Sequence, residues 1–290
     1  MRHLITLDGW NRDALIDLFA RADRFAAAGS GAHVERGGSA ALFFPPASLR
    51  TRFSFETGVS GLGLQPVTFP PETLDKNEDL GDVAHYLAQW ASIAVVRHPD
   101  ITVLERLAAA DALPVVNAMT DVNHPCEVLS DLYALSRKAG GDGSEAEREG
   151  GRADIFQRRY LFVGPDGNIG RAWAEAARAF GLELSQSAPA ILRVPGVRCE
   201  EDLEAAIRTA DVIITDGPGI HERALAPYRI TAELLGLAPS GARFNPCPPF
   251  VRGREVTADA IAHPTFVGHA FKRALKPVQQ AIMEWALGDA

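Results

Sequence analysis

The chain has 290 residues, of which 47% are hydrophobic and 23% are charged, and its formal net charge is −8. This length favours two domains of ordinary size, and the composition is that of a globular protein rather than a disordered one. The acidic total argues against nucleic acid as the main partner. The three cysteines lack CxxC spacing, so they indicate neither a disulfide framework nor a zinc site.

The amino-terminal sequence MRHLITLDGW lacks the apolar core of a signal peptide. No stretch of the chain approaches the roughly 20 apolar residues that a membrane span needs. We therefore expect a cytoplasmic protein that does not associate with a membrane.

Short apolar runs alternate with helical patterns through the first half of the chain. Strands are predicted over 40–45, 65–70, 92–98 and 113–119. Helices are predicted over 12–27, 49–63, 79–90, 103–111 and about 127–138. Repeated strand–helix units imply a parallel sheet with helices on its faces.

A second alternating series follows 140–154, which is rich in glycine and charge and is expected to be an exposed loop. Strands are predicted over 160–164, 211–216 and from 243, and helices over 171–180, 200–210 and 274–287. We therefore expect an α/β protein of two domains, each a parallel sheet flanked by helices, joined by long helices. The domains are placed at 1–135 and 150–271, with a last helix within 272–290 that packs back on the first domain.

Polar side chains follow three strands of the first predicted sheet, where ligands of parallel sheets collect. They are Ser48, Arg50, Thr51, Arg52, Arg97, His98 and His124. The first cluster also begins a helix, where hydroxyls cap N–H groups, the dipole favours an anion, and arginine suits phosphate oxygens. These residues indicate a phosphate site without a glycine-rich loop. An ordinary helix cap with solvated arginines explains the first cluster, taken alone, equally well.

The same residues resemble motifs of the aspartate/ornithine carbamoyltransferase family, closer to its ornithine branch. Ser48-Leu49-Arg50-Thr51-Arg52 resembles the family's Ser-Thr-Arg-Thr-Arg signature. His124-Pro125-Cys126-Glu127 resembles its His-Pro-Cys-Gln. Asn245-Pro246-Cys247-Pro248 stands where the family has His-Cys-Leu-Pro, and Arg273 resembles the arginine of Glu-Asn-Arg-Leu. The resemblance covers nearly the whole chain in the family's order.

The resemblance implies transfer of a carbamoyl group from carbamoyl phosphate to an amine, with no metal or other cofactor. It implies that Arg97, His124 and Thr51 stabilise the oxyanion of the tetrahedral intermediate. The residues that it assigns to carbamoyl phosphate are Ser48, Leu49, Arg50, Thr51, Lys76, Arg97, His124, Glu127, Pro246, Cys247, Pro248 and Arg273. Lys76 resembles a lysine contributed by a neighbouring subunit, which implies a homotrimer with shared active sites. An exposed loop lysine is an equally good interpretation of Lys76.

The amine-binding motif is less well matched. The sequence DVIITD resembles the family's Asp-x-x-x-Ser-Met-Gly with Asp211, Thr215 and Asp216 in register. Either Asn168 or Arg171 would meet an α-carboxylate. The acidic Asp216 stands close to where the aspartate enzymes have an arginine. This disfavours a dicarboxylate and favours an ornithine-like amine that carries a second cationic group.

Two departures from the family's motifs and one glycine pattern leave alternative functions to consider. Glu127 replaces the family's glutamine and adds negative charge near a phosphate site, and Asn245 replaces a histidine. A catalytically weak paralogue that binds carbamoyl phosphate as a scaffolding protein is therefore an alternative. Gly164, Gly167 and Gly170 suggest a nicotinamide-dependent oxidoreductase, but their spacing is not GxGxxG. Tight turns and close helix–strand packing explain these glycines adequately.

Overall fold

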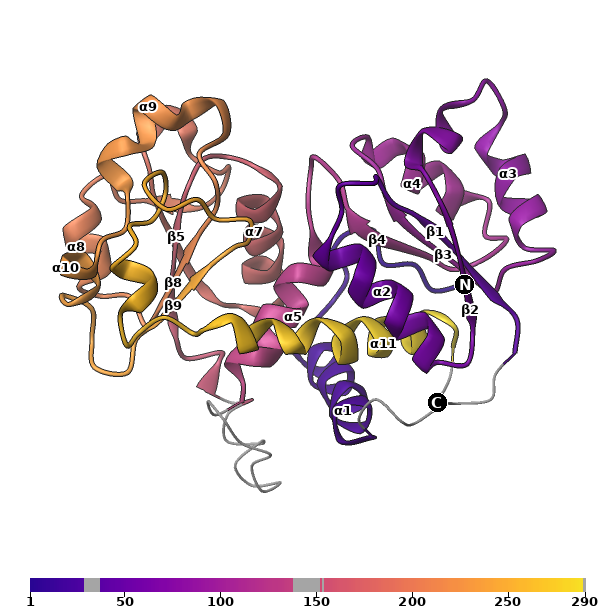
Figure 1. Cartoon of the computed structure of the whole chain (residues 1–290), viewed down its shortest axis with the longest axis horizontal. Coiled ribbons are helices and arrows are strands. Elements are labelled where there is room, and N and C mark those ends of the chain that lie inside the picture. The colour runs from indigo at the N-terminus through magenta and orange to yellow at the C-terminus, as the bar shows by residue number, and fades with distance from the viewer. Residues whose placement is uncertain (29–36, 138–151, 153, 289–290) are drawn as a thin grey trace. The chain divides into compact units, whose positions relative to one another are not determined.

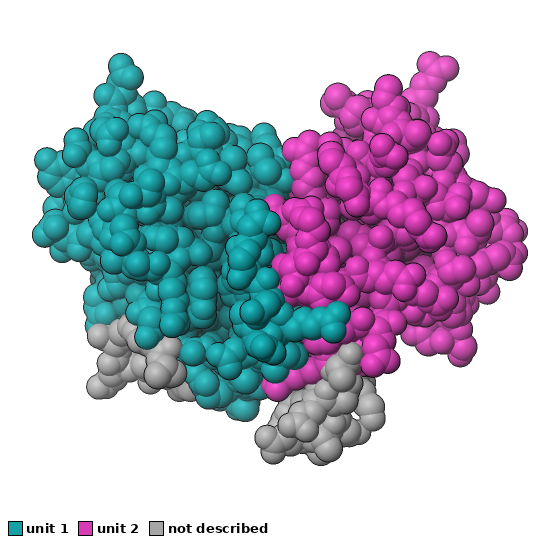
Figure 2. Space-filling model, turned by 180° about the vertical axis from the view of Figure 1, so that it is seen from behind, with its two compact units in different colours: residues 1–134, 272–290 teal, residues 135–271 magenta. Residues whose placement is uncertain are grey.

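The computed structural model describes residues 1–28, 37–137, 152 and 154–288. The chain divides into two compact units, Met1–Ala134 with Lys272–Ala290 and Leu135–Phe271, which are coloured separately in Figure 2. Most of the loop expected over 140–154, and the end of the helix expected at about 138, lie outside the described residues. Each unit contains a parallel sheet flanked by helices, which confirms the expected fold class.

The first unit is built on a parallel sheet with the strand order β2-β1-β3-β4 (Figure 1). Its strands are β1 (Ser39–Phe43), β2 (Gln65–Phe69), β3 (Ile93–Arg97) and β4 (Val115–Met119). The helical segments are α1 (Arg12–Ala28), α2 (Arg50–Gly61), η2 (Pro71–Asp75), α3 (Leu80–Leu87), α4 (Ile101–Ala109), α5 (Pro125–Leu135) and α11 (Leu275–Ala286).

Both faces of β1, β3 and β4 are largely buried, as in a sheet of βαβ units, whereas the edge strand β2 is partly exposed. Alternate strand residues such as Phe43, Ala94 and Val96 pack with the apolar faces of α3 and α4. Helix α11 packs against α1, α2 and β4, although it comes from the far end of the chain (Figure 1). Among the helices that the structure describes, none is long and apolar enough to cross a membrane.

The second unit contains a parallel sheet with the order β7-β6-β5-β8-β9 (Figure 1). Its strands are β5 (Arg159–Val163), β6 (Glu183–Ser187), β7 (Arg198–Cys199), β8 (Val212–Thr215) and β9 (Arg243–Pro246). Its α-helices are α7 (Asn168–Phe180), α8 (Leu203–Ile207), α9 (Glu222–Leu225) and α10 (Ala232–Leu235). The 3-10 segments are η3 (Ala190–Leu192), η4 (Gly219–His221), η5 (Ala226–Tyr228), η6 (Ala260–Ala262) and η7 (His269–Ala274), of which η7 continues into the first unit.

Strand β6 was not predicted, because its sequence Glu-Leu-Ser-Gln-Ser contains one apolar residue and gives no hydropathy signal. The buried amide of Gln186 stabilises this strand instead. Its Nε2 donates to the carbonyl oxygens of Gly164 and Leu192 at 2.8 and 3.1 Å, and its Oε1 accepts from the N–H of Val194 at 2.7 Å. Each polar atom of the amide therefore has a partner, as burial requires.

The glycines between β5 and α7 serve close packing. A Cβ built on Gly170 would lie 2.7 Å from Cε1 of Phe162 and 2.9 Å from Cγ2 of Val194. Any side chain at this position would push α7 away from β5. This contact supports the packing interpretation of the glycine spacing over the dinucleotide one.

Candidate active site

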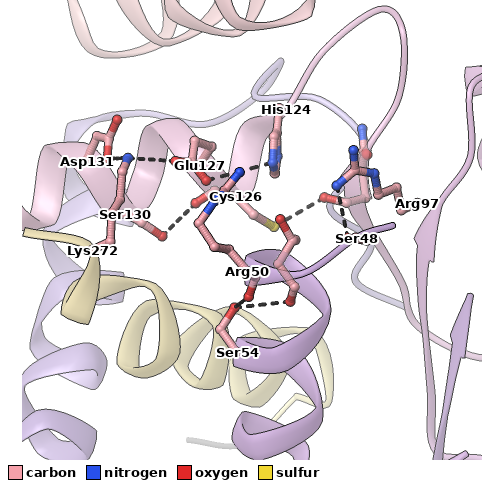
Figure 3. A network of polar contacts seen from close by, with 12 residues as sticks. Ser48, Arg50, Ser54, Arg97, His124, Cys126, Glu127, Ser130, Asp131 and Lys272 are labelled. Atoms are coloured by element: carbon pink, nitrogen blue, oxygen red, sulfur yellow. Dashed lines mark hydrogen bonds and ion pairs between the residues drawn. The ribbon is translucent and has the colours of Figure 1, made fainter. Parts of the chain in front are cut away.

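The amino end of α2 is the first part of the candidate site. The expected hydroxyl cap is not found: Leu49 is the N-cap residue and makes no capping bond through its side chain. Ser48 Oγ instead accepts a hydrogen bond from Nη1 of Arg97 at 3.0 Å (Figure 3). Ser48 and Thr51 are buried, whereas Leu49 and Arg50 are exposed. A helix amino end of this kind favours an anion.

Arg97 is the last residue of β3, where the pairing with β4 shifts register between Val96 and Arg97. An irregularity of this kind re-aims a side chain at the end of a strand. Burial lowers the pKa of Arg97 and nearby Arg50 lowers it further, while Glu127 opposes both effects. Arginine remains charged in proteins, so these two guanidiniums together favour a bound anion.

His98 does not join Arg97, although the sequence places them side by side. The His98 ring is buried, and its Nε2 lies 2.9 Å from Oδ1 of Asp75. This contact fixes the end of η2, directly before the exposed Lys76. His98 is thus a structural residue of the turn that presents Lys76.

His124 directly precedes the first residue of α5, Pro125, a position that suits proline. The preceding turn is fixed by hydrogen bonds from Thr120 N to Asn123 O (2.9 Å) and from Asn117 Nδ2 to Asn123 Oδ1 (2.6 Å). Burial lowers the pKa of His124 to about 4, and the positive charges of Arg97 and Lys272 lower it as well. The negative charge of Glu127 acts in the opposite direction. The imidazole is therefore neutral near pH 7, and a neutral N–H can polarise a carbonyl group.

Glu127 has a cation beside it that the sequence did not reveal. Nζ of Lys272 lies 2.6 Å from Oε1 of Glu127 and 2.5 Å from Oδ1 of Asp131 (Figure 3). Burial acts to raise the pKa of Glu127, but the ammonium group of Lys272 opposes it and is the main cause that holds the pKa below its ordinary value. Glu127 is therefore ionised and compensated. The neighbouring Arg273 is exposed.

The carboxyl edge of the second sheet brings together several residues assigned to the substrates. Thr215 ends β8, Asp216 follows it, and Pro246 ends β9. The N–H of Cys247 donates to the carbonyl oxygen of Thr215 at 2.9 Å, and the Pro248–Pro249 bond is cis. In the part of the chain that the structure describes, the buried Thr215 Oγ1 has no hydrogen-bond partner.

Asp211 lies at the other end of β8 and is not part of this edge. Its carboxylate accepts hydrogen bonds from Arg159 through N at 2.9 Å, Nε at 3.0 Å and Nη2 at 2.8 Å. The expected grouping of Asp211 with Thr215 and Asp216 is not found, because β8 separates them.

Helix α7 contributes its amino end to the same edge. Asn168 is its first residue, and the N-cap residue, Gly167, has no side chain to cap it. Arg171 holds Asp166 with both prongs of its guanidinium, at 2.6 Å from Nε to Oδ1 and 2.8 Å from Nη2 to Oδ2. A substrate carboxylate would have to displace Asp166 from Arg171.

An acidic pocket adjoins Asp216. It is lined by Val163, Gly164, Asp216, Pro218, Glu222, Leu225, Tyr228, Arg254 and Glu255. Nη2 of Arg254 lies 2.9 Å from Oε2 of Glu222, so this guanidinium is already paired. Glu255 Oε1 accepts from the N–H of Val251 at 2.6 Å, while its buried Oε2 has no partner within the described residues. The excess of carboxylates suits a cationic group.

Sequence reasoning missed most of this pocket, because its residues come from loops and short helices that carry no periodic signal. The exceptions are Asp216, from the amine-binding motif, and Gly164, from the glycine spacing. Within the described ranges, no group of three or more histidine, cysteine or acidic residues is arranged to hold a metal ion.

Comparison with known proteins identifies the family. Residues 2–137 match the family described as aspartate/ornithine carbamoyltransferase, carbamoyl-P binding domain. The ornithine carbamoyltransferase of Akkermansia muciniphila is 32% identical over 318 residues, covering 100% of this chain and 99% of that protein. That of Nitrobacter winogradskyi is 32% identical over 274 residues, covering 87% and 85%. The crystal structure of the enzyme from Burkholderia thailandensis is similar with a TM-score of 0.86, 26% identity and 99% coverage of both chains. The chain therefore belongs to the aspartate/ornithine carbamoyltransferase family.

Proposed function

We propose that this protein transfers the carbamoyl group of carbamoyl phosphate to an ornithine-like amino acid or a related amine. The products are a ureido compound and phosphate. The observation that carries the proposal is the hydrogen bond between Arg97 and Ser48, which joins a strand-end guanidinium to the amino end of α2. The relatives named ornithine carbamoyltransferase support the same reaction.

We call Ser48, Leu49, Arg50, Thr51, Arg97 and His124 the phosphate edge. The backbone N–H groups of α2 and the guanidinium of Arg50 bind the phosphate oxygens. Arg97, neutral His124 and the Thr51 hydroxyl surround the carbamoyl oxygen. Pro246, Cys247 and Pro248 offer carbonyl oxygens to the carbamoyl NH2, and Arg273 and a partner's Lys76 complete the site in a homotrimer. Residues 1–135 thus form the carbamoyl-phosphate domain, on which the C-terminal helix packs.

The reaction needs positioning and charge stabilisation rather than a covalent intermediate. The neutral amine attacks the carbamoyl carbon, and a C–N bond forms while the carbonyl oxygen becomes an oxyanion. Arg97, His124 and Thr51 stabilise this oxyanion. The bond from carbon to the phosphate oxygen then breaks, and the leaving phosphate accepts the proton released by the amine.

We call Asn168, Thr215, Asp216, Glu222 and Glu255 the amine edge, within the domain at 150–271. Asp216 and Glu255 hold a second cationic group of the amine substrate, while Glu222 is paired with Arg254. Two arginines of this unit, Arg171 and Arg254, are paired with Asp166 and Glu222, which disfavours a dicarboxylate substrate. This charge balance supports an ornithine-like amine.

The proposal is tested by phosphate release from carbamoyl phosphate with a panel of amines and mass detection of the ureido product. Single replacement of Arg50 and of Arg97 by methionine is expected to remove most of the release. Full activity in both variants would contradict the proposed site. The alternative of a catalytically weak scaffolding paralogue was based partly on an uncompensated charge at Glu127. Lys272 compensates this charge, so that part of the case for the alternative no longer holds.

A further inference from the structure

Lys272 is a buried ammonium group held between two carboxylates of one helix. Glu127 and Asp131 are four residues apart on α5 and therefore lie on the same face of it. Lys272 contacts both, at 2.6 and 2.5 Å, and all three side chains are largely buried, with exposed fractions of 16%, 8% and 3% for Lys272, Glu127 and Asp131. A buried pair of like charges without this cation would be strongly unfavourable.

The second oxygen of Glu127 connects this cluster to the phosphate edge. Lys272 holds Oε1, and Oε2 then lies 3.8 Å from Nε2 of His124 (Figure 3). Arg50 is also close enough to Glu127 to affect its charge state. The orientation and charge of Glu127 therefore affect the electrostatics of His124 and Arg50, two residues that we assign to carbamoyl phosphate.

Glu127 and Lys272 carry complementary charges at two positions where the family's motifs have neutral residues. Glu127 stands where the family has a neutral glutamine, and Lys272 stands directly before Arg273, where the family's Glu-Asn-Arg-Leu has a neutral asparagine. Glu127 is negatively charged, Lys272 is positively charged, and their side chains are in contact. A substitution at 127 alone would place an uncompensated carboxylate beside a site for a dianion.

We infer that Lys272 is a positioning residue for carbamoyl transfer, which neutralises Glu127 and fixes its carboxylate against His124. The inference rests on the proposed function for its consequence in turnover. Lys272 itself contacts neither substrate in this account. Its effect reaches carbamoyl phosphate through Glu127 and through His124, whose pKa it also lowers.

The test compares the KM for carbamoyl phosphate in a double-mutant cycle. Lys272→Met is expected to raise this KM by about tenfold, since it leaves Glu127 uncompensated. Adding Glu127→Gln to Lys272→Met is expected to recover most of the loss. Lys272→Arg, which keeps the charge, is expected to stay within about threefold of the original protein. Lys276→Met on α11 is the matched control and is expected to leave the KM unchanged.

A purely structural role would give a different pattern. Equal KM values for Lys272→Met with and without Glu127→Gln would overturn the inference, as would an unchanged KM in Lys272→Met. Should Lys272→Met not fold, the comparison moves to Lys272→Met with Asp131→Asn, with Glu127 kept or replaced by glutamine. The variant that keeps Glu127 is expected to bind about tenfold more weakly, and equal binding overturns the inference.

Calorimetric titration with inorganic phosphate separates this inference from the proposed function. It requires no amine and no turnover. If the original protein binds phosphate but carbamoylates no amine, the proposed function is contradicted. The phosphate affinities of the Lys272 variants still test the role of Lys272 in that case. If phosphate binding is equally tight in Lys272→Met and in the original protein, the inference is wrong even where transfer is observed.

Discussion

The two sheets of this protein have the same parallel design, yet their carboxyl edges carry opposite charge. The phosphate edge combines the amino end of α2 with Arg97 and a neutral His124. The amine edge combines Asp216 with Glu222 and Glu255. The difference lies in the pairing of the arginines. Arg97 is bonded to a neutral serine hydroxyl, whereas Arg171 and Arg254 are paired with carboxylates. A parallel sheet thus sets where a ligand binds, and the pairing of nearby charges sets its sign.

The largest effect is expected for Arg97→Met, which removes the guanidinium from the phosphate edge. The value of kcat/KM should fall by about 10²- to 10³-fold, because this group stabilises charge that develops in the transition state. Steady-state phosphate release measures the change. Arg106→Met, which removes an exposed arginine of α4 paired with Asp79, serves as the control and should leave kcat/KM unaltered.

A reciprocal pair of substitutions tests whether each edge binds one substrate. Asp216→Asn is expected to raise the KM for the amine by about 10- to 100-fold and leave that for carbamoyl phosphate nearly constant, since a charge-assisted contact is lost. Arg50→Met should give the opposite pattern. Glu233→Gln, at an exposed position of α10, is the control for charge in the second unit. Equal effects of Asp216→Asn on both KM values would contradict the assignment of one substrate to each edge.

Gly170→Ala should lower the stability of the protein and leave its affinity for carbamoyl phosphate and for the amine unchanged. Its Cβ would meet Phe162 and Val194 at distances that force a shift, so the free energy of unfolding should fall by about 1–3 kcal/mol. Thermal unfolding measures the loss. Gly217→Ala, whose Cβ would meet nothing within 4 Å, is the matched control. An unchanged melting temperature for Gly170→Ala would remove the packing interpretation of the glycine spacing.

The last prediction concerns the pH dependence of stability. The pKa of His124 is about 4 in the folded protein and about 6.5 in an unfolded chain, so the unfolded state binds more protons between these values. The free energy of unfolding should therefore rise with pH across that window, by at most about 1.4 kcal/mol per pH unit from this group. Chemical denaturation at several pH values measures the slope. His124→Gln should flatten it, and an equal slope in that variant would mean that His124 is not buried in its neutral form.

Local sequence patterns predicted the phosphate edge better than the amine edge. Ser48 to Arg52 form one contiguous motif at a strand–helix junction, so adjacency in sequence already implies adjacency in space. Asp211 was misassigned because it was placed by the motif match alone. It directly precedes β8 and pairs with Arg159, at the opposite end of the strand from Asp216.

Most of the other features that the sequence did not predict depend on contacts between residues far apart in the chain. Lys272 lies 145 residues from Glu127 in sequence, so no local pattern could reveal that the two charges meet. Strand β6 escaped detection because Gln186 stabilises it by hydrogen bonds rather than by apolar burial. Both failures involve buried polar groups, whose partners are fixed by the tertiary fold.

The most direct test of the central claim is carbamoyl transfer itself. Carbamoyl phosphate is incubated with ornithine, N-acetylornithine, lysine, putrescine, short diamino acids and aspartate, and phosphate and ureido product are measured together. The account predicts equal amounts of both products with an amine that carries a second cationic group, and little with aspartate. Aspartate as the preferred acceptor would contradict the amine edge, and a protein that fails to bind carbamoyl phosphate would contradict the account as a whole.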